Sequence, residues 1–131
     1  MTMRVGIDLV TTASVCESLA AHGNRYLERV FTSKEVTDCS PGGTPDAARL
    51  AARFAAKEAT FKVLRVGDRA VSWRDVEVDR DASGSVRVVL FGGAFELART
   101  EGIARLSLSF SHAGGRAAAV VVAEIDEPAD K

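Results

Sequence analysis

The sequence has few cysteines, no long apolar run and no excess of charge of either sign. Its two cysteines, Cys16 and Cys39, lack metal-ligand spacing, and so few thiols suit a reducing compartment. No apolar stretch is long enough for a signal peptide or a membrane span. Seventeen basic and eighteen acidic side chains give a net charge of −1. We therefore expect a cytoplasmic protein that binds neither nucleic acid nor membrane, with any anion site confined to a local cluster.

What the sequence does contain is typical of one globular domain. It has 131 residues, of which 47% are hydrophobic and 27% charged. This length and balance suit one compact core. We assign residues 1–126 to a single domain and expect residues 127–131 to form a loose tail.

The periodicity of apolar residues predicts an α+β fold. A period of two predicts strands, and a period near 3.6 predicts helices. The expected order is strand, helices, strands, helix, strands, written β-α-β3-α-β2, with one long central helix against an antiparallel sheet. Strands are expected near residues 5–10, 71–78, 85–91, 104–112 and 116–125, and helices near 11–23, 24–36, 45–64 and 93–102.

The segment VGIDLV, residues 5–10, places a charge inside a strand. Val5, Ile7 and Leu9 alternate along one face, and Asp8 lies on the other face. A carboxylate next to a packed sheet is costly unless it is paired or bound to a cation. From this segment alone, Asp8 either faces water or caps the next helix at the strand end, or it holds a cation.

The segment PDAARLAARFAAKEATFKVL, residues 45–64, is the strongest helix signal in the chain. It is rich in alanine, Pro45 suits the first helical position, and Gly67 follows the expected end. Leu50, Phe54 and Phe61 recur at helical spacing and predict its core stripe. Before this helix, CSPGGTP at residues 39–45 predicts a flexible surface loop.

The charged residues of this helix fall into two sets. Arg49, Arg53 and Lys57 are four residues apart and form a basic ridge, and Glu58 and Lys62 form a pair beside it. Both patterns are common on solvated helix faces. A carboxylate beside several cations also suits a magnesium-bound pyrophosphate, because Mg²⁺ takes carboxylate and phosphate oxygens while cations balance the remaining charge.

Five segments, in this order, resemble the holo-(acyl-carrier-protein) synthases, the small, single-domain class of 4′-phosphopantetheinyl transferases. They are VGIDLV at residues 5–10, RVFTSKE at 29–35, LAARFAAKEATFKVL at 50–64, WRDVEV at 73–78 and LSLSFSHAGGRAAAVVVAE at 106–124. The resemblance covers nearly the whole chain and implies the 4′-phosphopantetheinyl transferase fold.

The resemblance implies a magnesium site formed by two acidic residues. Asp8 matches the metal-binding aspartate of the family's first motif, and Glu58 matches the metal-binding glutamate of its Lys-Glu motif. Lys62 matches a family lysine placed near the phosphates. Glu58 and Lys62 are therefore the expected catalytic residues.

The resemblance also implies a binding site for coenzyme A, the substrate. Arg53 and Lys57 match basic positions of the family on the same helix, and Lys62 is counted with them as a binding residue. His112 closes the Ser-His motif and matches a histidine near the nucleotide phosphates.

The implied reaction is Mg-dependent transfer of 4′-phosphopantetheine from coenzyme A to a serine of an apo acyl carrier protein. The serine hydroxyl attacks the β-phosphate and 3′,5′-ADP leaves, while metal and cations stabilise the charge that moves. Glu58, or a metal-bound water that it orients, is the first candidate for the proton acceptor, and Lys62 is the second.

The sequence departs from the family pattern at the expected carrier-docking surface. Thr11 and Ser14 stand where these synthases often have a glutamate and an arginine, and that arginine helps to bind the acidic helix of the carrier. Arg25 and Arg29 are candidates to replace part of its function. Three hypotheses stay open: a synthase for a fatty-acid carrier, the same chemistry on a polyketide or peptide-pathway carrier, and a non-catalytic carrier- or nucleotide-binding homologue.

The resemblance finally implies a homotrimer with active sites at the subunit interfaces. Larger two-lobed transferases resemble two copies of this fold, with the Ser-His motif in one lobe and the other motifs in the second. A one-lobe chain would then take its histidine from a neighbour. Residues 117–125, AAAVVVAEI, are apolar on both faces, which is more than one sheet face needs to bury.

Two further residues have local interpretations. Glu35 belongs to a family motif, but Thr32-Ser33-Lys34-Glu35 is also a capping box, and we favour this local role. Trp73 is expected to pack in the core or at its rim.

Overall fold

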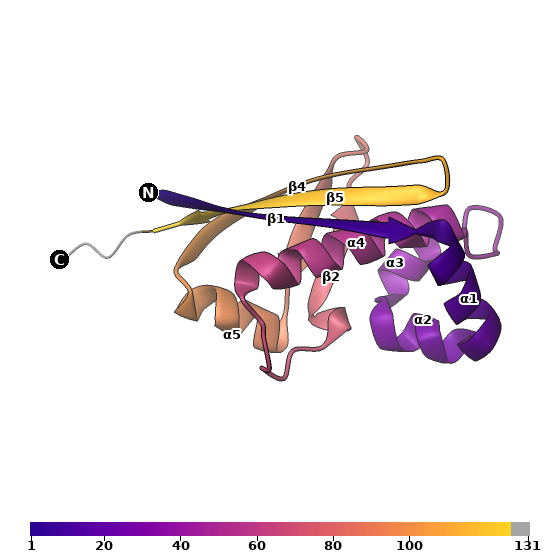
Figure 1. Ribbon diagram of the computed structural model, residues 1–131, viewed down its shortest axis with the longest axis horizontal. Coiled ribbons are helices and arrows are strands. Elements are labelled where there is room, and N and C mark those ends of the chain that lie inside the picture. The colour runs from indigo at the N-terminus through magenta and orange to yellow at the C-terminus, as the bar shows by residue number, and fades with distance from the viewer. Residues whose placement is uncertain (127–131) are drawn as a thin grey trace.

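The main sheet has three antiparallel strands in the order β1-β5-β4. The computed structural model describes residues 1–126, so the tail expected at 127–131 lies outside the described residues. Strand β5 (Arg116–Ile125) is central and pairs with β1 (Thr2–Thr11) and β4 (Ile103–Ala113). The long helix α4 (Ala47–Leu64) runs across one face of this sheet (Figure 1). The predicted α+β fold is confirmed.

The helices that precede α4 lie at one of its ends and the helix that follows the two-stranded sheet lies at the other, while that sheet passes the middle of α4 (Figure 1). Three short helices lead from β1 to α4, and a two-stranded antiparallel sheet and one more helix lead back to β4. They are α1 (Thr12–His22), α2 (Asn24–Val30), α3 (Ser33–Asp38), the 3₁₀ helix η1 (Trp73–Asp75), β2 (Val76–Arg80), β3 (Val86–Leu90) and α5 (Gly92–Thr100).

The written order β-α-β3-α-β2 counts one strand too many between α4 and α5. Within residues 1–126 the chain forms two strands there, at the places expected near residues 71–78 and 85–91, although the first begins only at Val76. Residues 73–75 form η1 instead, because the Ser72 and Asp75 side chains make a reciprocal capping box around it. The hairpin of β2 and β3 and the final pair β4 and β5 are as predicted.

The helix expected near residues 24–36 is two helices, α2 and α3, with a break at residues 31–32, and the ends of the other expected helices differ by one or two residues. Pro45 is not the first helical residue as expected, because α4 begins at Ala47. Asp46 caps the helix, and its carboxylate accepts from the Ala48 N–H at 2.9 Å. At the other end the left-handed residue is Arg65, with φ 57° and ψ 50°, rather than Gly67. Gly23 precedes α2 in the capping position, so Asn24 lies inside that helix.

The core lies between α4 and the inner face of the sheet. Most of α4 is buried, and its buried side chains are largely alanines, which let the helix come close to the strands. Gly6 sets the closest approach, since a Cβ there would lie 2.4 Å from the Ala59 carbonyl oxygen. Leu50 is buried as predicted, whereas Phe54 and Phe61 are half-buried.

Phe54 and Phe61 pack against Trp73 at the edge of the core. The ring centroids of Phe61 and Trp73 are 4.7 Å apart and stacked, and those of Phe54 and Trp73 are 5.1 Å apart. The predicted packing role of Trp73 is confirmed. The segment 39–45 runs over the surface, but Cys39 is fully buried and its carbonyl accepts from the Asp46 N–H at 2.8 Å, so hydrogen bonds close this loop.

The outer face of the sheet carries an exposed apolar row. Met3, Val5, Ile7 and Leu9 on β1 are 61–64% exposed. The register places Ile7 beside Val120 of the central strand. The next pairs on the same face, Val5 with Val122 and Leu9 with Ala118, are also apolar. This row comes from β1 as well as from the apolar segment 117–125 that the sequence pointed to.

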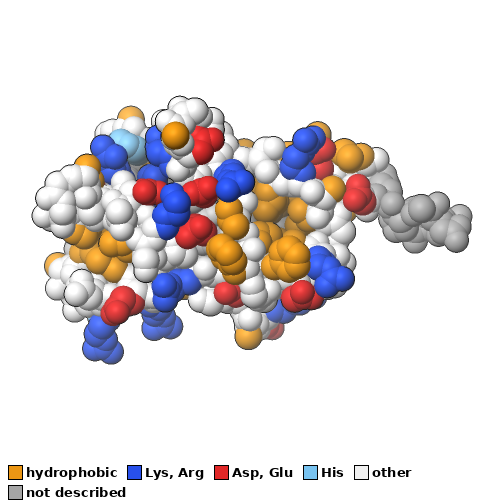
Figure 2. Space-filling model, turned by 180° about the vertical axis from the view of Figure 1, so that it is seen from behind, with side chains coloured by type: hydrophobic (Ala, Val, Ile, Leu, Met, Phe, Trp, Pro, Cys, Tyr) orange, Lys and Arg blue, Asp and Glu red, His pale blue; other side chains and the backbone are white. Residues whose placement is uncertain are grey.

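The rest of the surface is mixed in charge. Acidic and basic side chains are interspersed on the face seen in Figure 2, in line with the net charge of −1. Among residues 1–126, no helix combines the length and apolar character that a membrane crossing requires.

Candidate active site

Asp8 lies on the inner face of β1, where α4 passes over it. The Lys62 ammonium donates to Asp8 Oδ1 at 3.0 Å and to the Ile7 carbonyl at 2.8 Å. The Asp8 side chain is only 14% exposed, whereas that of Lys62 is 54% exposed. The carboxylate that the sequence left with two interpretations is therefore partly buried and paired with a cation from α4.

Glu58 lies one turn before Lys62 on the same side of α4. Partial burial raises the pKa of Glu58, the nearby charge of Asp8 raises it further, and Lys62 opposes this shift. The three predicted residues Asp8, Glu58 and Lys62 are thus brought together, as a close pair of carboxylates beside one ammonium group.

The donor set of this cluster fits a magnesium ion. Mg²⁺ is usually held by one or two carboxylates plus phosphate oxygens and water, and two adjacent carboxylates repel each other until a cation lies between them. Within residues 1–126, no group of three or more acidic, histidine or cysteine side chains forms a complete protein cage for a metal. Asp8 and Glu58 would therefore hold the ion only in part, leaving positions for substrate oxygens.

Arg53 and His112 come together in a second place. They line a cavity of about 600 Å³ with two further arginines, three aspartates and an aromatic ring. Arg53 is 3% exposed, its guanidinium lies 5.5 Å from the centroid of the Phe110 ring, and its Nε has no hydrogen-bond partner among the described residues. The other lining residues are Arg49, Arg80, Asp38, Asp46, Asp81 and Ala82. The three arginines are matched by three aspartates, so it is the buried, unpartnered donor of Arg53 that suits an anionic ligand.

The two groups lie on opposite sides of α4. Asp8 on β1 and Phe110 on β4 both pair with Ala119 of the central strand, so β5 separates them. Glu58 and Lys62 turn toward β1, whereas Arg53 turns toward β4. One chain therefore presents two half-sites rather than one continuous cluster.

Lys57 does not belong to either half-site, contrary to the expectation that it binds phosphate. Its side chain is fully buried, and its ammonium lies 2.7 Å from Glu35 Oε1. It also donates to the Trp73 carbonyl at 3.1 Å and to the Val76 carbonyl. The predicted basic ridge is wrong at this position, because α4 is buried on nearly all sides and Lys57 points into the protein toward α3 and β2.

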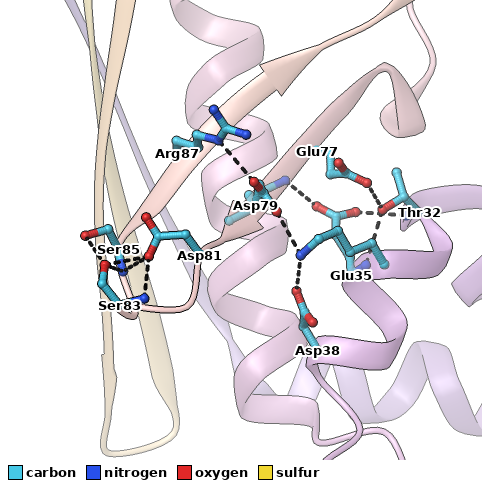
Figure 3. A network of polar contacts seen from close by, with 11 residues as sticks. Thr32, Glu35, Asp38, Glu77, Asp79, Asp81, Ser83, Ser85 and Arg87 are labelled. Carbon is cyan, nitrogen blue, oxygen red and sulfur yellow. Dashed lines mark hydrogen bonds and ion pairs between the residues drawn. The ribbon is translucent and has the colours of Figure 1, made fainter.

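Glu35 has the predicted capping role and a second role that the sequence did not reveal. Its Oε1 accepts from the Thr32 N–H at 2.9 Å, and its N–H donates to Thr32 Oγ1 at 3.2 Å, which confirms the capping box. Its Oε2 accepts from the Val78 N–H at 2.7 Å. Thr32 Oγ1 donates to Glu77 at 2.6 Å (Figure 3). Glu35 thus joins α3, α4 and β2.

The predicted docking residues Arg25 and Arg29 lie on α2 and line a cavity of about 460 Å³ with His22 and Tyr26. Burial raises the pKa of Tyr26 to about 12, and the charge of Glu58 adds to this shift. Ser14 is exposed at the start of α1, where its N–H donates to Thr11 Oγ1 at 3.2 Å. Thr11 therefore caps α1.

The chain is similar to known proteins along nearly its whole length. Residues 4–121 match the family model of the 4′-phosphopantetheinyl transferase superfamily. The chain is 42% identical to the holo-[acyl-carrier-protein] synthase of Moorella thermoacetica over 93% of this chain and 94% of that protein. It is 38% identical to that of Koribacter versatilis over 95% and 99%.

Solved structures of the same kind share the fold. The ACPS-CoA complex of Chronobacterium ammoniagenes has a TM-score of 0.85 at 30% identity and covers 97% of this chain and 100% of that one. The Helicobacter pylori holo-[acyl-carrier-protein] synthase in complex with coenzyme A has a TM-score of 0.80 at 30% identity, covering 92% and 100%. The chain belongs to the 4′-phosphopantetheinyl transferase superfamily. Within it, the chain is an enzyme of the holo-(acyl-carrier-protein) synthase class.

Proposed function

We propose that this enzyme transfers 4′-phosphopantetheine from coenzyme A to a serine of an apo acyl carrier protein and releases 3′,5′-ADP. The observation that carries the proposal is the cluster of Asp8, Glu58 and Lys62, two adjacent carboxylates with a lysine 3.0 Å from one of them. The relatives that cover nearly the whole chain are holo-(acyl-carrier-protein) synthases, and two solved relatives hold coenzyme A.

The residues of the cluster divide the chemistry between them. Asp8 and Glu58 would hold Mg²⁺, which supplies Lewis-acid stabilisation of the phosphate oxygens when bound. The Lys62 ammonium lies beside Asp8 and balances negative charge on the phosphoryl group and on the leaving nucleotide. The serine hydroxyl attacks the β-phosphate as the bond to the ADP oxygen breaks, and Glu58 accepts its proton.

The cavity around Arg53 and His112 is proposed to bind the nucleotide phosphates of coenzyme A. Arg53 brings a buried guanidinium with a free Nε–H, and His112 lies exposed near the end of β4. An anion in this cavity would satisfy the unpartnered donor of Arg53. Such a site binds and orients coenzyme A, whereas the bond changes take place at the carboxylate cluster.

We further propose that the enzyme is a cytoplasmic homotrimer whose active sites combine the half-sites of neighbouring subunits. The separation of the two half-sites by α4 supports this assembly, and the exposed apolar row on β1 offers surface for it. A heterologous interface that closes as a three-fold ring would place the Arg53 and His112 cavity of one subunit beside the Asp8 cluster of the next.

Subunit mixing tests the shared site. Asp8→Ala and His112→Ala should each be nearly inactive as homotrimers. Refolded together in equal amounts, they should recover about a quarter of the sites, namely those that pair an intact Asp8 with an intact His112 from the next subunit. If mixed trimers form by mass spectrometry but recover no activity, both residues act within one chain and the shared-site proposal fails.

The transfer itself is tested with a panel of carriers. The protein is incubated with coenzyme A, Mg²⁺ and apo carriers from fatty-acid, polyketide and peptide pathways, and each carrier is analysed for the pantetheine adduct by mass spectrometry. We expect an adduct on at least one carrier, its loss when EDTA removes the metal, and stoichiometric 3′,5′-ADP. Absence of adduct on every carrier would favour the non-catalytic alternative.

A further inference from the structure

Arg65 has a backbone conformation that the rest of the chain reserves for glycine. Within residues 1–126, eight glycines and one other residue, Arg65, have a positive φ. An L-residue with a Cβ is disfavoured in the left-handed region relative to glycine. Strain of this kind is retained where the side chain is needed, so an observed outlier is a reason to look for a function.

The fold itself does not need an arginine at this position. The Arg65 N–H ends α4 by donating to the Lys62 carbonyl at 3.2 Å, and a glycine would make the same bond without strain. Within residues 1–126 the Arg65 side chain is exposed and makes no hydrogen bond or ion pair. A cation is favourable near a helix C-terminus, but Lys62 already supplies one in the last turn.

The position of Arg65 relates it to the active site. It lines a cleft of about 320 Å³ together with Glu58 and Lys62, and the aromatic rings of Phe61 and Trp73 lie on the same cleft. The Lys62 ammonium is tied to Asp8, whereas the Arg65 guanidinium is free at the rim. Arg65 is thus a cation without a side-chain partner among residues 1–126, on the same cleft as Glu58, one of the two carboxylates that the acceptor serine must approach.

We propose that Arg65 is a specificity-determining residue that binds an acidic side chain of the carrier protein next to the acceptor serine. This inference rests on the proposed transfer from coenzyme A to a carrier. Lys62 and the cations of the second half-site already balance the phosphates, whereas an exposed residue at the rim meets the surface of the incoming protein.

The test separates carrier binding from folding and from coenzyme A binding. In Arg65→Gly, removal of the strain should leave the urea midpoint of unfolding unchanged or higher. We expect the KM for the carrier to rise about tenfold at low salt, with kcat and the KM for coenzyme A unchanged. Arg65→Glu should raise the carrier KM further, and Arg65→Lys should restore part of the loss.

A matched control removes an exposed arginine that lies outside the Arg65 cleft. Arg99→Ala deletes the same charge from α5, where the side chain is 67% exposed and pairs only with Glu96 of its own helix. Its carrier KM should match that of the wild type.

Three results would overturn the inference: an unchanged carrier KM in Arg65→Gly, a rise in the KM for coenzyme A instead, or an equal rise in Arg99→Ala. A fall in the urea midpoint of Arg65→Gly would assign Arg65 to the fold. Absence of transfer by the wild type would instead refute the proposed function, so the two failures are distinguishable.

Discussion

Replacement of Lys57 by methionine should destabilise the enzyme strongly. Lys57 and Glu35 are both 0% exposed, and their charged atoms are 2.7 Å apart. Loss of the ammonium leaves the Glu35 carboxylate buried with only backbone donors, from Thr32 and Val78, and leaves two carbonyls without their donor. Breaking a buried ion pair in this way costs about 3–5 kcal/mol.

The loss is a large part of the total stability. A domain of this size unfolds with about 5–15 kcal/mol, and urea lowers that value by about 1–3 kcal/mol per molar. A loss of about 4 kcal/mol should therefore lower the urea midpoint by roughly 2 M, followed by circular dichroism. The exposed pair of Arg99 and Glu96 provides the control, because Arg99→Ala should cost no more than about 1 kcal/mol.

A double-mutant cycle identifies the origin of the loss. Glu35→Gln removes the charge and keeps one oxygen, which can accept from one of the two backbone donors. Glu35→Gln with Lys57→Met should therefore cost less than the sum of the two single changes, by about 1–3 kcal/mol. The reasoning is refuted if Lys57→Met unfolds within 1 kcal/mol of the wild type, or if the two losses simply add. A stable Lys57→Met variant with an increased KM for coenzyme A would instead show that Lys57 binds the phosphates.

Three further predictions concern the metal, the carrier and the pH. Glu58→Gln should keep the fold but lose most turnover, because loss of the metal ligand removes several kcal/mol of transition-state stabilisation. Rates near those of the wild type at saturating Mg²⁺ would show that Glu58 is not a metal ligand. Ser14→Arg should raise kcat/KM for an acidic carrier at low salt, and an unchanged value would place residue 14 outside the docking face. Hydrogen bonds from Lys34 and Arg87 hold the pKa of Asp79 below its ordinary value of 3.8. At pH values above 3.8 these contacts therefore stabilise the fold, and their contribution is lost as the pH falls through the lowered pKa. Asp79→Asn should therefore reduce the loss of stability in acid, measured by urea unfolding at a series of pH values, and an unchanged slope would contradict this assignment.

Local patterns predicted most of the elements but not the orientation of α4. The hairpins follow from a period of two and short turns, and the long helix follows from its alanines and flanking signals. The same alanines obscured which side of the helix is buried, because small residues pack against several neighbours at once. Lys57 was therefore predicted on the surface, although it lies against α3 and β2.

The active-site cluster could be predicted only through the family resemblance. Asp8 and Glu58 are 50 positions apart, and no periodicity in either segment shows that β1 and α4 meet there. The signal for this meeting is Gly6, whose missing Cβ makes room for the Ala59 carbonyl. A glycine in the middle of an apolar strand indicates a close backbone approach, but the sequence alone does not name the partner.

The buried helix α4 also explains why the two half-sites are separate. A helix that packs closely on the sheet sends side chains out along both of its sides, toward β1 and toward β4. Its alanines bring the backbone close to the strands, so Lys62 reaches Asp8 on one side and Arg53 reaches the Phe110 ring on the other. Both sets are held rigidly by the same helix, but the helix itself lies between them. A ligand that spans from a phosphate at the carboxylates to a nucleotide at the arginines cannot pass through α4, so it must either go around the helix or bridge two subunits. The exposed apolar row lies on the outer face of β1, opposite the Asp8 cluster, and offers surface for the second solution.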